Sequence, residues 1–243
     1  MHQKTHGIVI HALKYGDNSL IVKIFTREFG LRTFMIKGFR GKKSSLHASL
    51  FMPLTIISMD ISSRKVASAF NTIKDASCHD PLHHIQADFG KQAIALFIAE
   101  VLYKTIADEA PHEDLYLFIE GVLKYLNDTT ALPSLYPQYF LLRYSQYLGL
   151  YPNDHGETSA PYFDMRDGIF NSNNNMHSDF MTEEESKGLK ELLGASISQL
   201  HELKMGNNLR NNLLHRLLHY YKIHLLNFRE IKSHTVLAEV LRG

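Results

Sequence analysis

The first 80 residues carry short runs of apolar and β-branched residues broken by turn residues, a pattern typical of β-strands. Tyr15-Gly16-Asp17-Asn18 separates the first two runs, and Gly30 precedes the third. The five runs occupy residues 7–13, 19–26, 31–37, 54–61 and 66–73. Five closely spaced short strands predict a small barrel, of which the oligonucleotide-binding (OB) fold is the commonest five-stranded form.

From Pro81 the period changes, and apolar residues recur at steps of three and four, as in amphipathic helices. The predicted helices run from Pro81 to about residue 107, over 111–126 and 137–148, from a capping box at Thr182, from Asn207 or Asn208, and over 233–241. Residues 151–180 lack a period, so we expect an extended surface loop or a reduced hairpin there. The chain is thus predicted to be an α+β protein of two domains, residues 1–80 and 81–243, with an irregular insertion at about 151–180.

Charge is distributed unevenly between these parts. Residues 1–80 contain 12 lysines and arginines against 5 aspartates and glutamates, whereas residues 81–200 contain 7 against 17. Residues 201–243 are again basic, with 7 against 3. Because like charges in one folded unit repel each other, the basic barrel indicates an anionic partner, commonly nucleic acid.

The basic residues gather around one loop and its neighbouring strand. The candidate nucleic-acid-binding residues are Arg32, Lys37, Arg40, Lys42, Lys43, Phe34, Phe39, Arg64 and Lys65. Cations neutralise phosphates and aromatic rings stack on bases, so such a surface would bind DNA with strong salt dependence and little sequence preference. In the alternative interpretation the loop is only solvated and the phenylalanines belong to the core.

No pattern in the sequence indicates a catalytic centre, a cofactor or a metal. The single cysteine, Cys78, excludes multi-cysteine zinc sites, and neither a phosphate-binding loop nor a GxGxxG motif occurs. His79, His83 and His84 lie near Cys78, but they straddle the predicted domain junction. His215 and His219 are one helical turn apart without the glutamate of an HExxH site.

The order of several motifs resembles the RecO family. Its turn and the Phe-Thr-x-Glu-x-Gly segment match residues 14–22 and 25–30, and its basic loop matches Lys37-Gly38 and residues 40–43. Residues 140–144 with Leu148-Gly149-Leu150, and the terminal Ser233-His234-Thr235-Val236-Leu237, are similar to helical motifs of the same family. One departure is that many RecO proteins hold four zinc-binding cysteines after the Leu-Gly-Tyr helix, and residues 152–180 contain none. We therefore expect a zinc-free, degenerate module.

The resemblance implies a recombination mediator in DNA repair that is not an enzyme. Such a protein would bind single- and double-stranded DNA, anneal complementary strands and help load recombinase with RecR. It also implies contact with the acidic, aromatic-ended tail of single-stranded-DNA-binding protein. Such a tail would need an apolar pocket rimmed by cations, for which the candidates are Arg143, Arg210, Arg216 and Lys222.

Two other functions stay open from the sequence. The barrel could be a protein-interaction adaptor, or Cys78 and the nearby histidines could serve a metal-dependent hydrolase. No apolar run is long enough to span a membrane, and the N-terminal residues lack the apolar segment of a signal peptide. We therefore expect a cytoplasmic protein, associated with the nucleoid if it binds DNA.

Overall fold

The computed structural model describes residues 2–39, 46–62, 71–106, 110–153, 160–172 and 177–240. The chain forms two compact units, Met1–Thr130 and Ala131–Gly243. Within the described ranges, no helix has the length and apolarity needed to cross a membrane.

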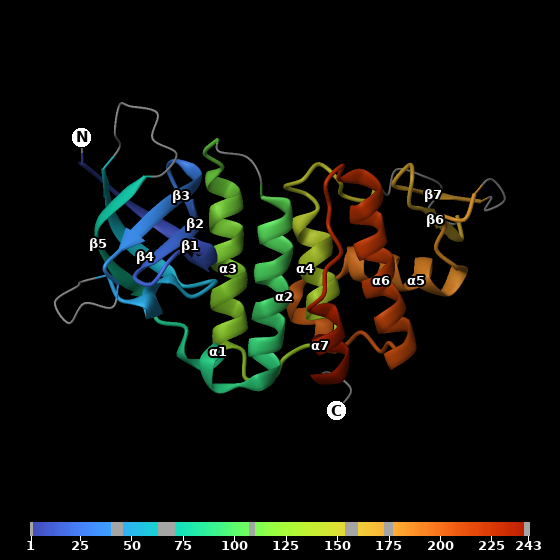
Figure 1. The fold of residues 1–243 in the computed structure, drawn as a ribbon. Coiled ribbons are helices and arrows are strands. Elements are labelled where there is room, and N and C mark those ends of the chain that lie inside the picture. Colours follow the sequence, from blue (N-terminus) through green and yellow to red (C-terminus); the bar gives the residue numbers. More distant parts are fainter. Residues whose placement is uncertain are drawn as a thin grey trace. The chain divides into compact units, whose positions relative to one another are not determined.

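The first unit contains a five-stranded antiparallel sheet with the order β3-β2-β1-β4-β5 (Figure 1). The strands are β1 (His2–Lys14), β2 (Ser19–Thr26), β3 (Gly30–Lys37), β4 (Ile56–Ser62) and β5 (Thr72–Asp80). A fifth strand was predicted at 66–73, and β5 includes the last two of these residues but extends seven residues further. Residues 63–70 lie outside the described residues, and β5 continues to Asp80 through mostly polar, exposed positions, among which Ala76 is buried.

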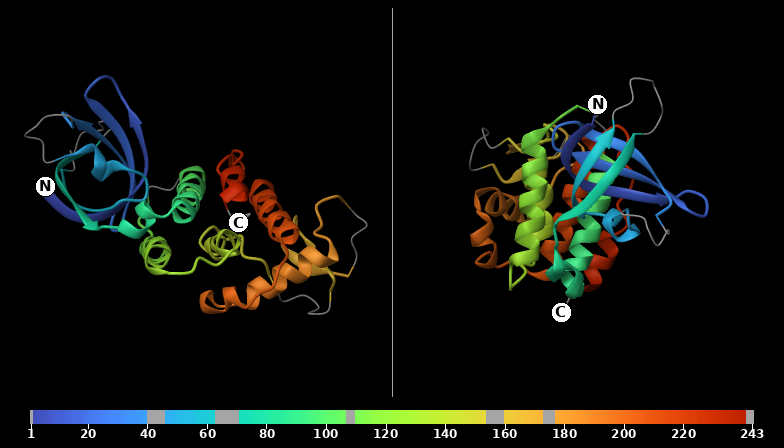
Figure 2. Two further views of the ribbon diagram at one scale, coloured as in Figure 1. Left: turned by 90° about the horizontal axis from the view of Figure 1, so that it is seen from below. Right: turned by 90° about the vertical axis from the view of Figure 1, so that its left-hand side faces the viewer.

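The two edges of the sheet approach each other at a bridge between described residues. Phe34 of β3 and Asn71 form a parallel bridge, with Met35 N donating to Asn71 O at 3.2 Å and Asn71 N donating to Thr33 O at 3.0 Å. A short 3-10 helix, η1 (Ala48–Phe51), lies between β3 and β4 in the chain and buries Phe51. The sheet curls strongly (Figure 2), and among the described residues no continuous ladder joins β3 to β5, an arrangement compatible with an OB barrel.

Alternation along the strands decides which side chains fill the barrel. Because successive strand residues point to opposite faces, Val22 and Ile24 of β2 point inward together with Phe34 and Ile36 of β3. All four are at most 1% exposed. The outer face of the same strands therefore carries the intervening residues, some of which remain open to solvent.

Three helices complete the first unit: α1 (His83–Ala87), α2 (Phe89–Thr105) and α3 (Glu113–Asp128). The predicted single helix from residue 81 to about 107 was wrong, because Asp88 interrupts it with extended backbone and accepts a hydrogen bond from Lys91 N as the N-cap of α2. Lys91 is itself buried, and its Nζ donates to the carbonyl oxygens of Asn127 and Thr129, each at 2.7 Å. This lysine fastens α2 to the C-terminal end of α3.

The second unit is mainly helical, with a small hairpin. It contains α4 (Tyr136–Tyr144), β6 (Tyr162–Asp164), β7 (Ile169–Asn171), α5 (Glu183–Gly194), the 3-10 helix η2 (Ile197–His201), α6 (Asn207–His224) and α7 (His234–Val240). Thr182 and Glu185 form the predicted capping box at the start of α5. The predicted α+β fold, a five-stranded sheet followed by a helical region, is thus confirmed.

Candidate nucleic-acid interface

Helices cover only part of the outer face of β1, β2 and β3. Ile8, Phe25 and Leu31 lie side by side in register on this face, and each is at most 8% exposed. Tyr116 of α3 packs near Phe25, with ring centroids 6.3 Å apart. At the edge of this contact Arg27 pairs with Glu113 of α3 at 2.6 Å. The covered half of the face therefore joins the barrel to its helices.

The other half of the outer face remains accessible. Its two cross-strand rows are His11–Lys23–Thr33 and Leu13–Ile21–Met35. None of these six residues is buried, and Leu13 is 56% exposed. We refer to these six residues as the open sheet face. It combines an apolar row with a polar row that contains Lys23, at the end of the strands that leads to the β1–β2 turn.

Helix α2 contributes an aromatic ring to this surface. Tyr103 stacks on His11 with a ring-centroid distance of 4.1 Å and an interplanar angle of 24°. Lys23 Nζ lies over the Tyr103 ring, 5.3 Å from its centroid. Burial, and secondarily the charge of Lys23, lowers the pKa of His11, so its imidazole is neutral at pH 7.

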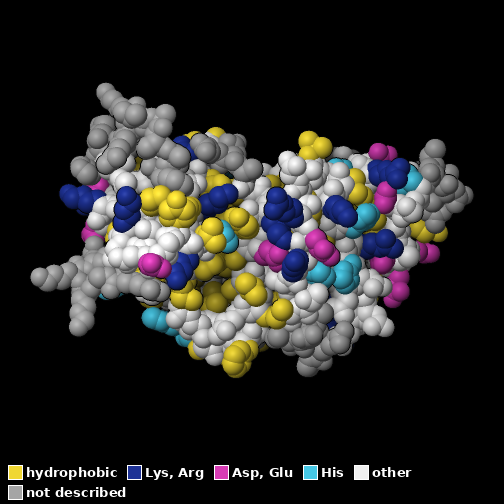
Figure 3. All heavy atoms as spheres, viewed as in Figure 1, with side chains coloured by type: hydrophobic (Ala, Val, Ile, Leu, Met, Phe, Trp, Pro, Cys, Tyr) yellow, Lys and Arg dark blue, Asp and Glu magenta, His cyan; other side chains and the backbone are white. Residues whose placement is uncertain are grey.

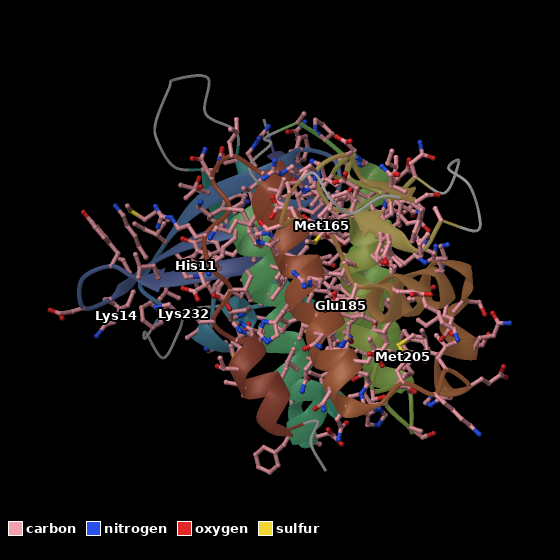
Figure 4. The ribbon with its side chains drawn as sticks, turned by 90° about the vertical axis from the view of Figure 1, so that its right-hand side faces the viewer. His11, Lys14, Met165, Glu185, Met205 and Lys232 are labelled. Carbon is pink, nitrogen blue, oxygen red and sulfur yellow. The ribbon has the colours of Figure 1, made fainter. Side chains whose placement is uncertain are left out.

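Cations lie at the rim of the open sheet face. Lys37 at the end of β3 is exposed and shares the face of Thr33 and Met35. Lys14 at the end of β1 is exposed as well, but it lies in register with Leu20 and Ile36, which alternate toward the barrel core. Figure 3 shows hydrophobic side chains with Lys and Arg side chains around them over this part of the sheet, and Figure 4 shows Lys14 farther along β1 than His11, toward the hairpin tip. The surface can therefore attract phosphates while presenting apolar and aromatic groups.

The structure separates the sequence-predicted residues by face. Lys37 shares the outer face of β3 with Thr33 and Met35, as a DNA-binding role requires. Arg32 instead shares the alternation of Phe34 and Ile36, and its Nη1 donates to Leu31 O at 3.0 Å. Arg32 is thus placed apart from the open sheet face.

The two phenylalanines belong to the core. Phe34 is completely buried and cannot offer its ring to a base, so its assignment as a stacking residue is corrected. Phe39 is partly buried and packs against the same core cluster. Phe34 lies on a strand of alternating apolar residues, and Phe39 lies shortly after the end of that strand. Burial is the usual state of aromatic rings at such positions. The cations Arg40, Lys42, Lys43, Arg64 and Lys65 lie outside the described residues.

Tyr15 and Tyr103 are not among the candidate binding residues predicted from the sequence. Tyr15 is 56% exposed but its sequence pattern indicates only a turn, and Tyr103 is 38% exposed but lies in a stretch whose pattern indicates only a helix. A signal for Tyr103 exists in the spacing of Phe89, Leu96 and Tyr103, which places three large apolar side chains at intervals of seven along one helix face. That spacing cannot identify the strand residue on which Tyr103 stacks.

Three of the four predicted partner-binding cations make contacts within the helical unit. Arg143 donates to the carbonyl oxygen of Ala195 at 2.7 Å and to the Tyr151 hydroxyl at 2.9 Å. Arg210 donates to Met205 O at 2.8 Å, and Arg216 pairs with Glu185 at 3.0 Å. Lys222 is exposed on α6. A structural role thus accounts for the first three.

The cysteine and histidine candidates are dispersed. Cys78 is exposed on β5, while His79 hydrogen-bonds Ser58 at 3.1 Å and packs on His6. His84 instead faces the end of α3, where its Nδ1 lies 3.2 Å from Asn127 O. Among the described residues, no group of three or more histidine, cysteine or acidic side chains is arranged to hold a metal ion.

The region expected to replace the zinc module forms a hairpin, one of the two predicted alternatives. β6 and β7 pair through Tyr162–Asn171, Phe163–Phe170 and Asp164–Ile169. Buried Asp164 accepts hydrogen bonds from the backbone N–H groups of Arg166 and Asp167, and it lies 3.3 Å from His177 Nε2. Polar side chains therefore organise this hairpin.

These features define a class of two-part proteins in which an OB-type barrel precedes a helical domain with an inserted hairpin. Two family models match the chain: "Recombination protein O N terminal" over residues 1–82 and "Recombination protein O C terminal" over residues 86–233. Proteins named DNA repair protein RecO from Phocaeicola vulgatus and Bacteroides fragilis are each 35% identical to it over 240 and 241 residues. A third, from Flavobacterium psychrophilum, is 34% identical, and all three matches cover 99% of both chains.

The chain belongs to the RecO family of DNA repair and recombination proteins. The predicted family is thus confirmed, and membership gives the chain a role in DNA repair and recombination.

Proposed function

We propose that this protein binds single- and double-stranded DNA through the open sheet face and the cationic residues Arg40, Lys42 and Lys43, and anneals complementary strands. The observation that carries the proposal is the cationic and apolar surface left uncovered by α2 and α3. Lys23 lies on this surface, Lys37 lies beside it at the end of β3, and three more cations, Arg40, Lys42 and Lys43, follow shortly after Lys37 in the sequence. Such a surface suits phosphate backbones of any sequence.

The proposed annealing requires no chemical step. Two strands that repel each other can approach when lysines neutralise their phosphates, and weak contacts with the bases leave Watson–Crick edges able to pair. We accordingly propose that the protein is not an enzyme and that it helps load recombinase together with RecR. The RecR partnership is supported by family membership alone.

A test of DNA binding compares two pairs of lysines in the same barrel. In K23Q/K37Q both neutralised residues lie on the proposed surface, whereas in K4Q/K74Q they lie on exposed positions of β1 and β5. Fluorescence anisotropy with a labelled oligonucleotide, measured across a series of salt concentrations, should show weaker binding for K23Q/K37Q. The slope of log affinity against log salt should become shallower by roughly 0.7 for each single-strand phosphate that the variant no longer neutralises.

The same titration distinguishes the adaptor alternative. Negligible DNA affinity of the parent protein at low ionic strength would favour a barrel that binds protein partners. Equally weakened binding in the two double variants would show that only total charge matters. A variant with Arg40, Lys42 and Lys43 neutralised should lose both binding and strand annealing. The hydrolase alternative instead requires turnover that is abolished by a chelator and by Cys78→Ala.

We further propose that the acidic tail of single-stranded-DNA-binding protein binds the helical unit. Because Arg143, Arg210 and Arg216 have structural contacts, Lys222 is the predicted cation best suited to this role. A labelled peptide with an acidic, aromatic-ended sequence should bind the parent protein more tightly than Lys222→Gln. Unchanged peptide affinity in this variant would remove Lys222 from the site.

A further inference from the structure

The contact between Tyr103 and His11 joins two parts of the chain that no local sequence pattern relates. His11 belongs to β1, the central strand of the sheet, and Tyr103 belongs to α2. Their rings are stacked at 4.1 Å, yet Tyr103 remains 38% exposed. A large aromatic ring is therefore both fixed in orientation and accessible to a ligand.

The surroundings of this ring combine the two properties that a nucleotide requires. Lys23 Nζ lies 5.3 Å from the ring centroid, and two further exposed apolar residues, Leu13 of β1 and Tyr15 in the turn after it, are each 56% exposed. An ammonium group beside an aromatic ring can neutralise a phosphate while the ring contacts the attached base. Burial and the charge of Lys23 lower the pKa of His11, so the imidazole stacked on Tyr103 is neutral. It therefore adds no second positive charge that would favour one phosphate position over another.

We propose that Tyr103, supported from behind by His11, is a stacking platform for an unpaired nucleobase, and that it makes the open sheet face selective for single-stranded over duplex DNA. This inference rests on the proposed DNA-binding function and adds a ligand class and a residue to it. In a duplex the bases are already stacked on each other, so their faces are closed to Tyr103. The lysines, by contrast, can contact the phosphates of either form.

The test measures single-strand and duplex affinities side by side. Tyr103→Leu removes the aromatic ring but keeps an apolar side chain, and Tyr103→Phe keeps the ring. Phe89→Leu is the matched control, because Phe89 is an 83% exposed aromatic residue on the same helix but two heptads away from Tyr103. Anisotropy would be measured with an oligothymidine and with a duplex of the same length, at one fixed salt concentration and then across a salt series.

Tyr103→Leu should weaken oligothymidine binding roughly tenfold, in keeping with the removal of one stacked base, and change duplex binding less than about twofold. The salt dependence should stay at the parent value, because the variant keeps every cation. Tyr103→Phe and Phe89→Leu should both bind oligothymidine like the parent.

A second measurement uses the unaltered protein and so does not depend on the folding of a variant. Irradiation of the complex with an oligonucleotide containing 5-iodouracil should crosslink the base to Tyr103 or His11, identified by mass spectrometry of the digested protein.

Two outcomes would overturn the inference while leaving the proposed function intact. In the first, Tyr103→Leu binds single strands as the parent does, while K23Q/K37Q loses affinity for both forms of DNA. In the second, crosslinks form only at residues away from Tyr103 and His11. If the parent binds neither single strands nor duplex, the proposed function fails together with the inference.

Discussion

Asp179 and His219 share a hydrogen bond of 2.9 Å between Oδ1 and Nε2, which links the segment before α5 to helix α6. Arg166 donates to the other carboxylate oxygen of Asp179 at 2.7 Å. The hydrogen bond with His219, followed by that with Arg166, lowers the pKa of Asp179 below its usual value. A carboxylate with two donors thus holds the β6–β7 turn and α6 together.

Replacement of this carboxylate should have a pH-dependent effect on stability. A carboxyl group whose pKa is lower in the folded than in the unfolded protein stabilises the fold fully above the unfolded pKa, near about 4, and loses this contribution as the pH falls through the folded pKa. Asp179→Asn should therefore lower the free energy of unfolding at pH 7 by about 1 kcal/mol. Below about pH 4 the difference from the parent should shrink.

Urea denaturation at pH 7 and at pH 3 checks this effect. Asp167→Asn is the control, because Asp167 is an exposed carboxylate in the β6–β7 turn, next to Arg166. If Asp179→Asn is destabilised as much at pH 3 as at pH 7, the introduced amide disturbs packing and the charge of the carboxylate is not the cause.

Gly168 should not tolerate a side chain. Its φ is +70°, and a Cβ atom at this position would lie 2.7 Å from the Tyr220 hydroxyl, which donates to Leu150 O. Gly149 has the same φ but nothing within 4 Å of its Cβ position. Gly149→Ala should cost about 1 kcal/mol, the cost of left-handed backbone alone, and Gly168→Ala should cost clearly more. Thermal unfolding of the two variants measures the difference, and equal shifts would show that Tyr220 moves aside freely.

The burial of Phe34 predicts a stability effect without a DNA-binding effect. Phe34→Leu keeps a large apolar side chain and should lower the free energy of unfolding by about 1 kcal/mol. Its affinity for oligothymidine should equal that of the parent, in contrast with Tyr103→Leu. Phe39→Leu, at a partly buried position, should be less destabilised. Weaker DNA binding by folded Phe34→Leu would restore the assignment of this ring as a stacking residue.

Arg143 should behave as a structural residue. Its guanidinium group donates to Leu193 O at 3.3 Å and to Ala195 O at 2.7 Å, at the C-terminal end of α5 where backbone carbonyls lack helical partners. Arg143→Ala should lower the free energy of unfolding by about 2 kcal/mol, and Lys222→Ala on exposed α6 by less than about 0.5 kcal/mol. Chemical denaturation separates the two variants. A fully stable Arg143→Ala protein that fails to bind a partner would support a partner-binding role for Arg143.

Local sequence determined much of the element order. The alternating runs and the turn at Tyr15–Asn18 predicted β2 at its observed bounds of Ser19–Thr26, because strand period and turn chemistry are properties of adjacent residues. The capping box at Thr182 and the start of α6 at Asn207 were likewise predicted from local patterns. By contrast, the extension of β5 to Asp80 was missed, because its mostly polar, exposed residues carry no strong period.

A basic barrel followed by a helical region could be predicted from the amino-acid order alone, because charge and periodicity are local properties of the chain. Which side of each strand is buried, and so whether Phe34 and Lys37 face the core or the solvent, became clear only from the packing of the folded chain. Alternation defines two faces but does not say which one a helix or the core will cover. The stacking of Tyr103 on His11 depends on the packing of α2 against the sheet, which brings together residues far apart in the chain.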